Sequence, residues 1–546
     1  MLNPHPVPHN DAPAPWWRGL PLLRLLTFLG LAVHLLLLFR PDESFVSRPY
    51  QEDAFYSLSV ARSIAQGRGL TIDGVQPTNG VQPLICFLYA PAFMIGGSDM
   101  YLALRLTLLL QVLIYAAVVF IVAWFMTTLL RPGTPRQEVF WLMAMLMAWS
   151  YTFSNGMLNG LETGLAVAMA CLVAGYYNVV IAPRPEGSAG RYFLLGALLG
   201  LAVLTRIDMA FLVASIIVTH LWHAHLRYNS LKGAERFAAL RRTLVQCFIM
   251  GAASILVSSP WWIYNQLTFG SLLPISGQAQ QMLIPDPRVN LESTVLVLVN
   301  ALMPLVHTPV LYYDYSPMLA PLVFIAALVL LVTLGRGWGT VRETFARWKG
   351  FWDYSGALPL VIFGVALIIY YIFFFGAPHF VVRYLMTVRV LIGAGVIAFI
   401  YLMWRLAPRT GRFRPMLILL LAGCMGASAY AMSWNFTDFW GNLYLYPARW
   451  IAENTTPPQK VGMFQSGTTG FLAPQTVANL DGKVNVSALR ALQAGRLPAY
   501  VDSMRFDYIV DWDHFIDQAL ADPAVRSQYE LVDTIVGDFQ VWKRIE

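Results

Sequence analysis

Residues 19–57 read GLPLLRLLTFLGLAVHLLLLFRPDESFVSRPYQEDAFYS, an apolar run that ends in a polar loop. The apolar part is long enough to cross a hydrocarbon core of about 30 Å, and no small-residue cleavage site follows it, so we expect an anchor rather than a removable signal peptide. Glu52 and Asp53 lie side by side just beyond it. Because carboxylates beside a bilayer are costly to desolvate, the pair indicates proton or charge chemistry on a group delivered from the membrane; a solvated loop pair is the plainer alternative.

The composition is typical of a protein that crosses the membrane many times. The chain has 546 residues, of which 57% are hydrophobic and 12% are charged, and its mean hydropathy is +0.56. The basic residues fall in short clusters between apolar runs. This is the pattern of cytoplasmic loops, and it argues against nucleic-acid binding. The four cysteines show no metal or redox spacing, so we expect small core residues rather than disulfides or a zinc site.

The basic clusters also predict the topology. If all of them are cytoplasmic, residues 1–18 form a cytoplasmic tail and residues 19–433 form a transmembrane domain of about eleven helices. Residues 41–101 are then the first external loop, and an odd number of crossings places residues 434–546 outside. The predicted spans are 19–40, 102–130, 138–153, 163–182, 192–205, 209–223, 244–263, 309–333, 354–377, 387–405 and 415–433.

Two further apolar stretches fit this topology poorly. Residues 81–97 are short and interrupted by Pro83 and Pro91, and counting them as a crossing would place every later basic cluster outside. We therefore expect a juxtamembrane or re-entrant element there, and another at residues 292–303.

The polar segment 434–546 is predicted to be a small α/β domain. Strand-like runs occur at 460–464, 506–511 and 529–535, and helix-like runs occur at 446–454, 486–494 and 515–521. Strands that alternate with helices indicate a compact module with its own core. Such a module either covers an outer cavity and shapes acceptor binding, or it is a purely structural cap.

Unusual polar residues gather in the loops that this topology places outside. Arg206 and Asp208 interrupt an apolar stretch from 192 to 222, which leaves both side chains at or just below the outer membrane surface. The alternative is a turn sealed by a local ion pair. Glu162 precedes a predicted helix, so it fits a helix cap and a site residue equally well.

Group transfer at this face needs a base and cations. Glu52 or Asp53 can take a proton from an acceptor hydroxyl. Arg62, Arg206 and Arg383 can hold a phosphate leaving group, because a guanidinium fork matches phosphate oxygens and stays charged. Together these residues indicate transfer of a group from a lipid-linked phosphate.

Six stretches of the chain form an ordered series of motifs. They are the segment EDAFYSLSVARSIAQGRGL at 52–70, then Asn159-Gly-Leu-Glu-Thr-Gly164, Leu204-Thr-Arg-Ile-Asp208, Phe269-Gly-Ser-Leu-Leu-Pro274, Arg383-Tyr-Leu385 and Asn479-Leu-Asp-Gly-Lys-Val-Asn485. The series resembles motifs of GT-C fold glycosyltransferases, and most of all those of the branch that includes bacterial arabinofuranosyltransferases and protein-mannosyltransferase-like proteins. The segment 52–70 is similar to the first external loop of that branch.

The resemblance implies a polyprenyl-phosphate-sugar donor, a glycan, lipid or protein acceptor, and inverting transfer at the outer face of a bacterial cytoplasmic membrane. A divalent cation is possible, and no metal ligand is assigned. The catalytic role falls on the acidic pair, either Asp53 or Glu52. Contacts with the donor phosphate and the substrates fall on Arg62, Glu162, Arg206, Asp208, Ser276, His379 and Arg383.

The sequence departs from that branch at several charged positions. Glu52 stands where Asp is common, which favours Asp53 as the base. Ser59, Asn265 and Gln280 occupy positions where the branch often has a cation. A rival interpretation is a lipid or glycan transporter that uses the acidic pair for proton coupling; transporters tend to show internal repeats, and none is visible in this sequence.

Overall fold

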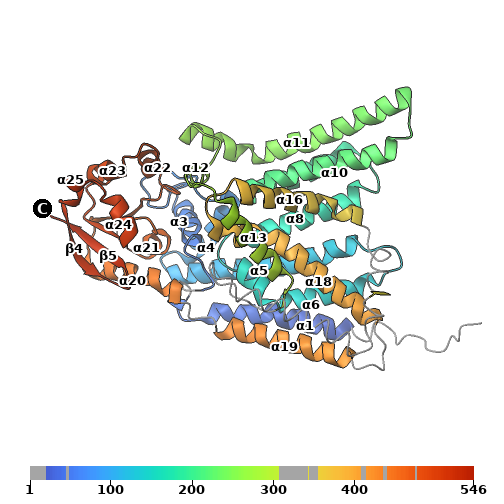
Figure 1. Ribbon diagram of the computed structural model, residues 1–546, viewed down its shortest axis with the longest axis horizontal. Helices are drawn as coiled ribbons and strands as arrows, with labels where there is room; N and C mark the ends of the chain where they lie inside the picture. The colour runs from blue at the N-terminus through green and yellow to red at the C-terminus, as the bar shows by residue number, and fades with distance from the viewer. Residues whose placement is uncertain are drawn as a thin grey trace, which may run out of the picture.

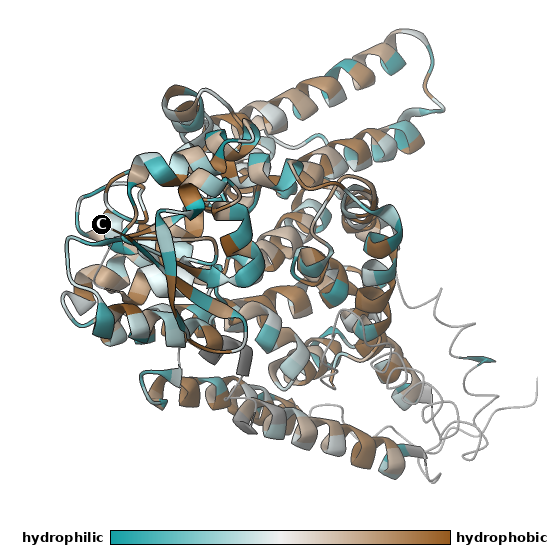
Figure 2. Ribbon diagram, turned by 60° about the vertical axis from the view of Figure 1, so that its left-hand side comes forward, coloured by the Kyte–Doolittle hydropathy of each residue, from teal (hydrophilic) through white to brown (hydrophobic). Residues whose placement is uncertain are grey.

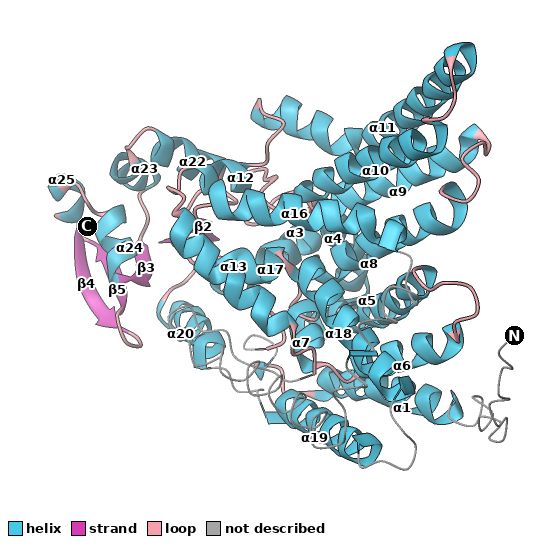
Figure 3. Ribbon diagram, turned by 45° about the vertical axis from the view of Figure 1, so that its right-hand side comes forward, coloured by secondary structure: helices cyan, strands magenta, loops and turns pink. Residues whose placement is uncertain are grey.

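The computed structural model describes residues 20–44, 48–305, 342–343, 354–406, 413–434, 439–473 and 476–545. Long helices run side by side through one part of the molecule, and a small sheet domain at the C-terminus lies at one end of them (Figure 1). The strands of the described chain that belong to a sheet all lie in this C-terminal domain (Figure 3).

Seven helical stretches of the described chain are long and apolar enough to cross a membrane. Hydrophobic residues dominate them, whereas the sheet domain mixes both kinds (Figure 2). The protein is therefore a polytopic α-helical membrane protein, as predicted. The seven stretches are Leu20–Phe39, Met100–Thr128, Thr163–Ile181, Ile207–Tyr228, Gly233–Phe269, Ser355–Phe373 and Met386–Arg405, and shorter apolar helices occupy Pro83–Gly96, Ala189–Thr205 and Arg414–Tyr430.

The helices of this membrane part occur in the following order. They are α1 (Leu20–Val33), α3 (Ala54–Ala65), α4 (Pro83–Gly96), α5 (Met100–Thr128), α6 (Arg136–Ala148), α7 (Tyr151–Met157), α8 (Thr163–Tyr176), α9 (Ala189–Thr205), α10 (Ala210–Tyr228), α11 (Gly233–Phe269), α12 (Ile275–Gln281), α13 (Pro287–Ala301), α16 (Leu358–Phe373), α17 (Val381–Tyr384), α18 (Met386–Leu406) and α19 (Phe413–Trp434).

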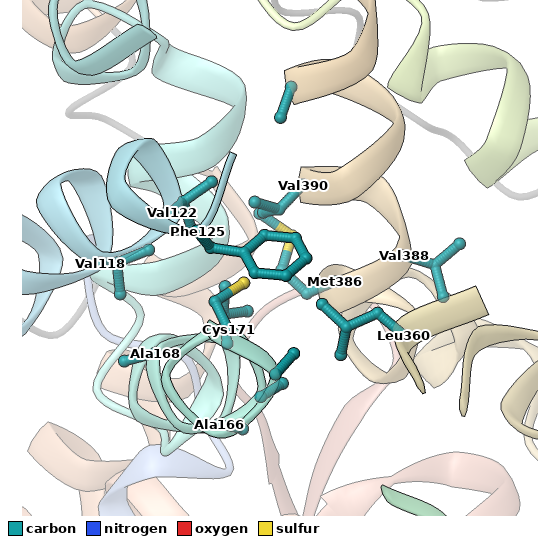
Figure 4. Packing of buried hydrophobic residues seen from close by; sticks show 14 of the residues in the cluster. Val118, Val122, Phe125, Ala166, Ala168, Cys171, Leu360, Met386, Val388 and Val390 are labelled. Atoms are coloured by element: carbon teal, nitrogen blue, oxygen red, sulfur yellow. The ribbon is translucent and has the colours of Figure 1, made fainter. Parts of the chain in front are cut away.

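The core of the membrane part includes apolar side chains from α5, α8, α16 and α18, which pack against one another in Figure 4. Close helix contacts use small residues, as expected where lipid is as apolar as leucine. Gly196 and Gly200 of α9 face α11, and a Cβ added at these positions would lie 2.4 Å from the Met250 carbonyl and 2.6 Å from the Ser254 carbonyl. The pair therefore allows the two backbones to touch.

Some predicted spans differ from the observed helices. The predicted span 138–153 is divided into α6 and α7, because Ser150 ends one helix and caps the next by accepting a hydrogen bond from the Phe153 N–H at 3.2 Å. α11 is much longer than the predicted 244–263, since its polar first turns continue the same helix. The stretches 81–97 and 292–303 are helical within α4 and α13. The predicted span 309–333 lies outside the described residues.

The C-terminal domain is an α/β module with a five-stranded sheet in the order β2-β1-β3-β5-β4. β1 pairs in parallel with β2 and β3, and β5 runs antiparallel to β3 and β4. The predicted strands correspond to β1, β3 and β4, while β2 and β5 were not predicted. The elements are α20 (Phe439–Asn454), β1 (Lys460–Met463), α21 (Gly467–Leu472), β2 (Thr476–Asn479), α22 (Val486–Gln493), α23 (Leu497–Met504), β3 (Tyr508–Trp512), α24 (Asp513–Ala519), α25 (Pro523–Arg526), β4 (Tyr529–Thr534) and β5 (Phe539–Arg544).

The carboxyl ends of the parallel strands point toward the membrane part. The loop after β1 places Gly467 against Glu52, and the loop after β2 places Lys483 against Gly80. Ligands commonly bind at this edge of a parallel sheet. The two parts of the molecule therefore meet where a binding site is expected.

Candidate active site

A cavity of about 360 Å³ lies between the membrane part and the C-terminal domain. Its wall brings together residues that are far apart in the sequence. Six of the residues predicted for the site line it: Asp53, Glu162, Arg206, Asp208, Ser276 and Arg383.

Asp53 and Arg383 form an ion pair in this cavity. Arg383 Nη1 donates to Asp53 Oδ2 at 2.9 Å, and the side chains of Arg383 and Asp53 keep 16% and 25% of their surface exposed, respectively. Asp53 directly precedes α3, and Arg383 lies on the short helix α17. Burial alone would raise the pKa of Asp53, but the charges of Arg383 and Lys483 hold it below its ordinary value. Asp53 is therefore an ionised carboxylate that faces the cavity.

Arg206 is held by two carboxylates. It contacts Asp208 Oδ2 at 2.7 Å and Glu162 Oε1 at 3.3 Å, and all three side chains are buried. The Tyr371 hydroxyl also donates to Asp208. Glu162 makes no side-chain hydrogen bond that caps α8, so its described contact is the one with Arg206. The local Arg206–Asp208 ion pair, which was the alternative interpretation of these two residues, is present in the structure. Glu162 extends this pair into a network of three charged side chains.

Aromatic rings join the two charged groups. The Arg206 guanidinium lies 4.5 Å from the centre of the Tyr384 ring, and Tyr384 stacks on Tyr371 with ring centres 5.0 Å apart. The Tyr384 hydroxyl accepts a hydrogen bond from Arg383 Nη2 at 3.3 Å. These contacts fix the direction of both guanidinium groups, because a stacked ring restricts their rotation.

Glu52 points away from its neighbour Asp53 and into the C-terminal domain. One of its carboxyl oxygens accepts a hydrogen bond from the Gly467 backbone, while Oε2 is buried and has no hydrogen-bond partner within the described chain. Burial and the nearby Asp53 charge raise the pKa of Glu52 to about 8. At neutral pH Glu52 is therefore largely protonated, and it links the two parts of the molecule.

Lys483 is a site residue that the sequence interpretation did not assign. It lies in the loop after β2, lines the cavity and pairs with Asp481 at 3.0 Å. Burial works against its charged form, but Asp481 and Asp53 raise the pKa of Lys483. Lys483 and Arg383 both lie against the Phe380 ring, at 5.8 and 4.6 Å from its centre. Its position inside the motif at 479–485 could have identified Lys483 as a site residue from the sequence.

The position of Lys483 depends on a glycine. A Cβ added at Gly80 would lie 1.8 Å from the Lys483 carbonyl oxygen, so any side chain there must move one of the two backbones. We predict that Gly80→Ala destabilises the protein by about 1–3 kcal/mol, a typical cost of overpacking, and withdraws Lys483 from the cavity. Thermal unfolding measures the first effect and sugar transfer the second. Gly251→Ala is the matched control, since a Cβ there meets nothing within 4 Å; equal behaviour of the two variants would contradict the prediction.

Besides Glu52, two predicted site residues do not line the cavity. Arg62 does not line the cavity: its Nη1 donates to the Phe471 carbonyl at 2.9 Å, and its guanidinium lies 4.4 Å from the centre of the Phe471 ring. His379 is exposed and sits beside the cavity, next to Phe380. Asn265, one of the positions where a cation was expected, is buried and bonds to Asn79 and to the Leu272 carbonyl, so it holds the turn before α12.

The carboxylates of the cavity do not form a set that fits a divalent cation. Asp53 pairs with Arg383, while Glu162 and Asp208 pair with Arg206. Across the described ranges, no group of three or more His, Cys, Asp or Glu side chains is placed to hold a metal ion. A divalent cation requires several free oxygen ligands.

Comparison with solved structures finds the same architecture over most of the chain. ArnT from Cupriavidus metallidurans bound to undecaprenyl phosphate aligns with a TM-score of 0.51 and 13% identity, over 96% of this chain and 98% of that chain. The Archaeoglobus fulgidus oligosaccharyltransferase tethered with an acceptor peptide aligns with a TM-score of 0.51 and 12% identity, over 97% and 74% of the two chains. The chain has the GT-C fold.

The GT-C assignment confirms the predicted fold class, including the small C-terminal sheet domain. Archaeal AglB from Archaeoglobus fulgidus, in complex with an inhibitory peptide and a dolichol-phosphate, aligns with a TM-score of 0.50 and 12% identity, over 94% and 73% of the two chains. Residues 445–544 match the family described as "Domain of unknown function (DUF8728)". No curated protein sequence matches the chain.

Proposed function

We propose that this GT-C protein transfers a sugar from a polyprenyl-phosphate-linked donor to an acceptor at the outer face of a bacterial cytoplasmic membrane. One observation carries the proposal: the ionised carboxylate of Asp53 faces the same cavity as the cations Arg383 and Lys483. A base next to two cations suits an acceptor hydroxyl next to a phosphate leaving group.

In the proposed reaction Asp53 takes the proton from the acceptor hydroxyl. The acceptor oxygen forms a bond with the anomeric carbon of the sugar, and the bond between that carbon and the phosphate oxygen breaks. The electron pair goes to the phosphate, where Arg383 and Lys483 stabilise the developing charge. Asp53 then releases its proton to solvent, which restores the site.

The structure favours Asp53 over Glu52 as the base. Asp53 is ionised and lines the cavity, whereas the pKa of Glu52 is raised to about 8 and its carboxyl group contacts Gly467. A general base must be deprotonated and within reach of the acceptor. Glu52 therefore has a positioning role in this proposal.

The cavity also has an apolar wall that suits a lipid carrier. Phe211 of α10 and Tyr370 of α16 pack against each other with ring centres 5.6 Å apart, and Phe374 follows α16 with 65% of its surface exposed. An apolar wall beside the charged side chains of the cavity fits a molecule with a charged head and an apolar tail.

The solved structures support the class of donor and acceptor. ArnT is bound to undecaprenyl phosphate in its structure, and AglB is in complex with a dolichol-phosphate and a peptide. We therefore propose that this chain also uses a polyprenyl-phosphate-linked donor, with a glycan, lipid or protein as the acceptor. Membership of the arabinofuranosyltransferase branch stays a prediction from the sequence motifs.

Binding of undecaprenyl phosphate to the full-length protein in detergent tests the proposed donor site. We predict saturable binding that weakens at least about tenfold in Lys483→Gln, because a charge-assisted hydrogen bond contributes about 1.5–3 kcal/mol. Arg496→Gln, which removes an exposed charge from the same domain, is the control. Equal affinities of the wild type and Lys483→Gln, with both proteins folded, would contradict the proposed donor site.

A further inference from the structure

A second pocket adjoins the cavity, and the exposed surface of its lining is mostly polar. It has a volume of about 240 Å³ and lies between α3, the turn that follows α3, and the α21–β2 segment of the C-terminal domain. α3 and α21 are in contact in the structure and lie close together in Figure 1. Both parts of the molecule therefore build this pocket, as they build the cavity.

One row of residues on α3 extends from the cavity to the second pocket. Asp53, Tyr56, Ser59 and Arg62 follow each other at three-residue spacing, so they lie on neighbouring turns of the helix. Asp53 and Tyr56 line the cavity, whereas Tyr56, Ser59 and Arg62 line the second pocket. Tyr56 is thus a wall that both spaces share, and Asp53 lies one turn away from the second pocket.

Two guanidinium groups and one carboxylate, Asp73, give the pocket a net positive charge. Within the described residues, Arg62 and Arg68 donate to the Phe471 carbonyl and to Gln66 Oε1, and neither forms an ion pair with a carboxylate. Burial and the neighbouring charge of Arg68 lower the pKa of Arg62 to about 10. A partly buried cation beside a second cation is unfavourable without a counter-ion. A bound anion would remove this cost.

The other polar groups of the pocket have separate roles. Asp73, the carboxylate in the lining, accepts hydrogen bonds from the Val75 and Gln76 backbones at 2.8 and 3.1 Å and so holds its own turn. Ser59 and Ser466 contribute hydroxyl groups to the wall. Guanidinium groups together with hydroxyls suit a ligand that carries both an oxyanion and hydroxyls.

We propose that this pocket is the acceptor subsite and that it binds a saccharide bearing carboxylate or phosphate groups. The inference rests on the proposed glycosyl transfer, because an acceptor held there lies one turn of α3 from Asp53, on the other side of the Tyr56 side chain. The donor lipid is a poor fit to this pocket, since its lining lacks the large exposed apolar residues found at the cavity. Arg62 is then a ligand of the acceptor and not of the donor phosphate.

Titration calorimetry on the full-length protein in detergent tests the subsite with three probes: oligogalacturonate as the carboxylate, an oligomer of glycerol phosphate as the phosphate, and neutral oligogalactose. We expect at least one anionic probe to bind more tightly than oligogalactose. Arg62→Gln should weaken that binding about tenfold or more, whereas Arg62→Lys, which keeps the charge, should weaken it less. Arg496→Gln, which has the same change of net charge, should leave it unchanged.

Three outcomes would overturn the subsite. They are equal affinity for the anionic and neutral probes, unchanged binding in a folded Arg62→Gln, and a loss of undecaprenyl phosphate binding in Arg62→Gln that matches its loss of saccharide binding. Asp53→Asn should bind the anionic probe normally. The binding affinities therefore test the proposed subsite, whereas the turnover of Asp53→Asn tests the proposed transfer. A failure of one proposal can be distinguished from a failure of the other.

Discussion

Replacing Asp53 by Asn is expected to lower sugar transfer by about 10²–10⁴-fold, the usual contribution of a general base. The substitution keeps the size of the side chain and removes both its negative charge and its ability to take a proton. Arg383 loses its ion pair at 2.9 Å but keeps Tyr384 as a hydrogen-bond partner. The measurement is transfer from a lipid-linked sugar in membranes that contain equal amounts of folded protein.

Glu52→Gln is the matched control for this experiment. Since burial keeps Glu52 largely protonated at neutral pH, Gln imitates the protonated form and can still accept a hydrogen bond from the Gly467 backbone. We expect this variant to retain most of the activity. Unchanged turnover in both variants would contradict a catalytic role of the acidic pair. A loss of turnover confined to Glu52→Gln would show that Glu52, and not Asp53, is the base.

Replacing Arg383 by Gln should have the second largest effect. Removing one preorganised group that stabilises developing charge typically costs about 10²–10³-fold in rate. The guanidinium also holds the pKa of Asp53 below its ordinary value, and burial raises that pKa once the cation is absent. The base is then protonated at a higher pH, so the acid side of the pH–rate profile should shift upward in this variant.

Arg383→Lys separates the charge of Arg383 from its shape. Lysine keeps the positive charge near Asp53 but lacks the planar fork that reaches both Asp53 and Tyr384. We expect an intermediate rate and a smaller shift of the acid limb. A pH–rate profile that does not change in Arg383→Gln would contradict the coupling between Arg383 and Asp53.

The helices of the membrane part were largely predictable, because long apolar runs have few alternatives to membrane-spanning helices. The division between α6 and α7 was not, since both sides of Ser150 are apolar and a lone serine is a weak signal. The length of α11 was missed because its first turns, from Gly233 to Arg242, are polar and continue beyond the apolar stretch.

The site was predictable to the extent that its residues carry charges next to apolar runs. Asp53, Arg206, Asp208 and Arg383 stood out for this reason, and the cavity brings them together. The direction of Glu52 was not predictable, because the adjacent residues Glu52 and Asp53 before α3 point to different parts of the molecule. The direction of Arg62 was not predictable either, because its partner Phe471 comes from the C-terminal domain. Lys483 was missed because its loop reaches the cavity only through the packing of the C-terminal domain on Gly80.

Mass analysis of lipid-linked sugars and surface glycans in cells that lack the protein tests the proposed transfer most directly. If the protein uses a polyprenyl-phosphate-linked donor, one such lipid should accumulate and one glycan modification should disappear. The wild-type gene should restore both, and the Asp53→Asn variant, present at the same level, should restore neither. Unchanged lipid-linked sugars in these cells, or full restoration by Asp53→Asn, would contradict the proposed function.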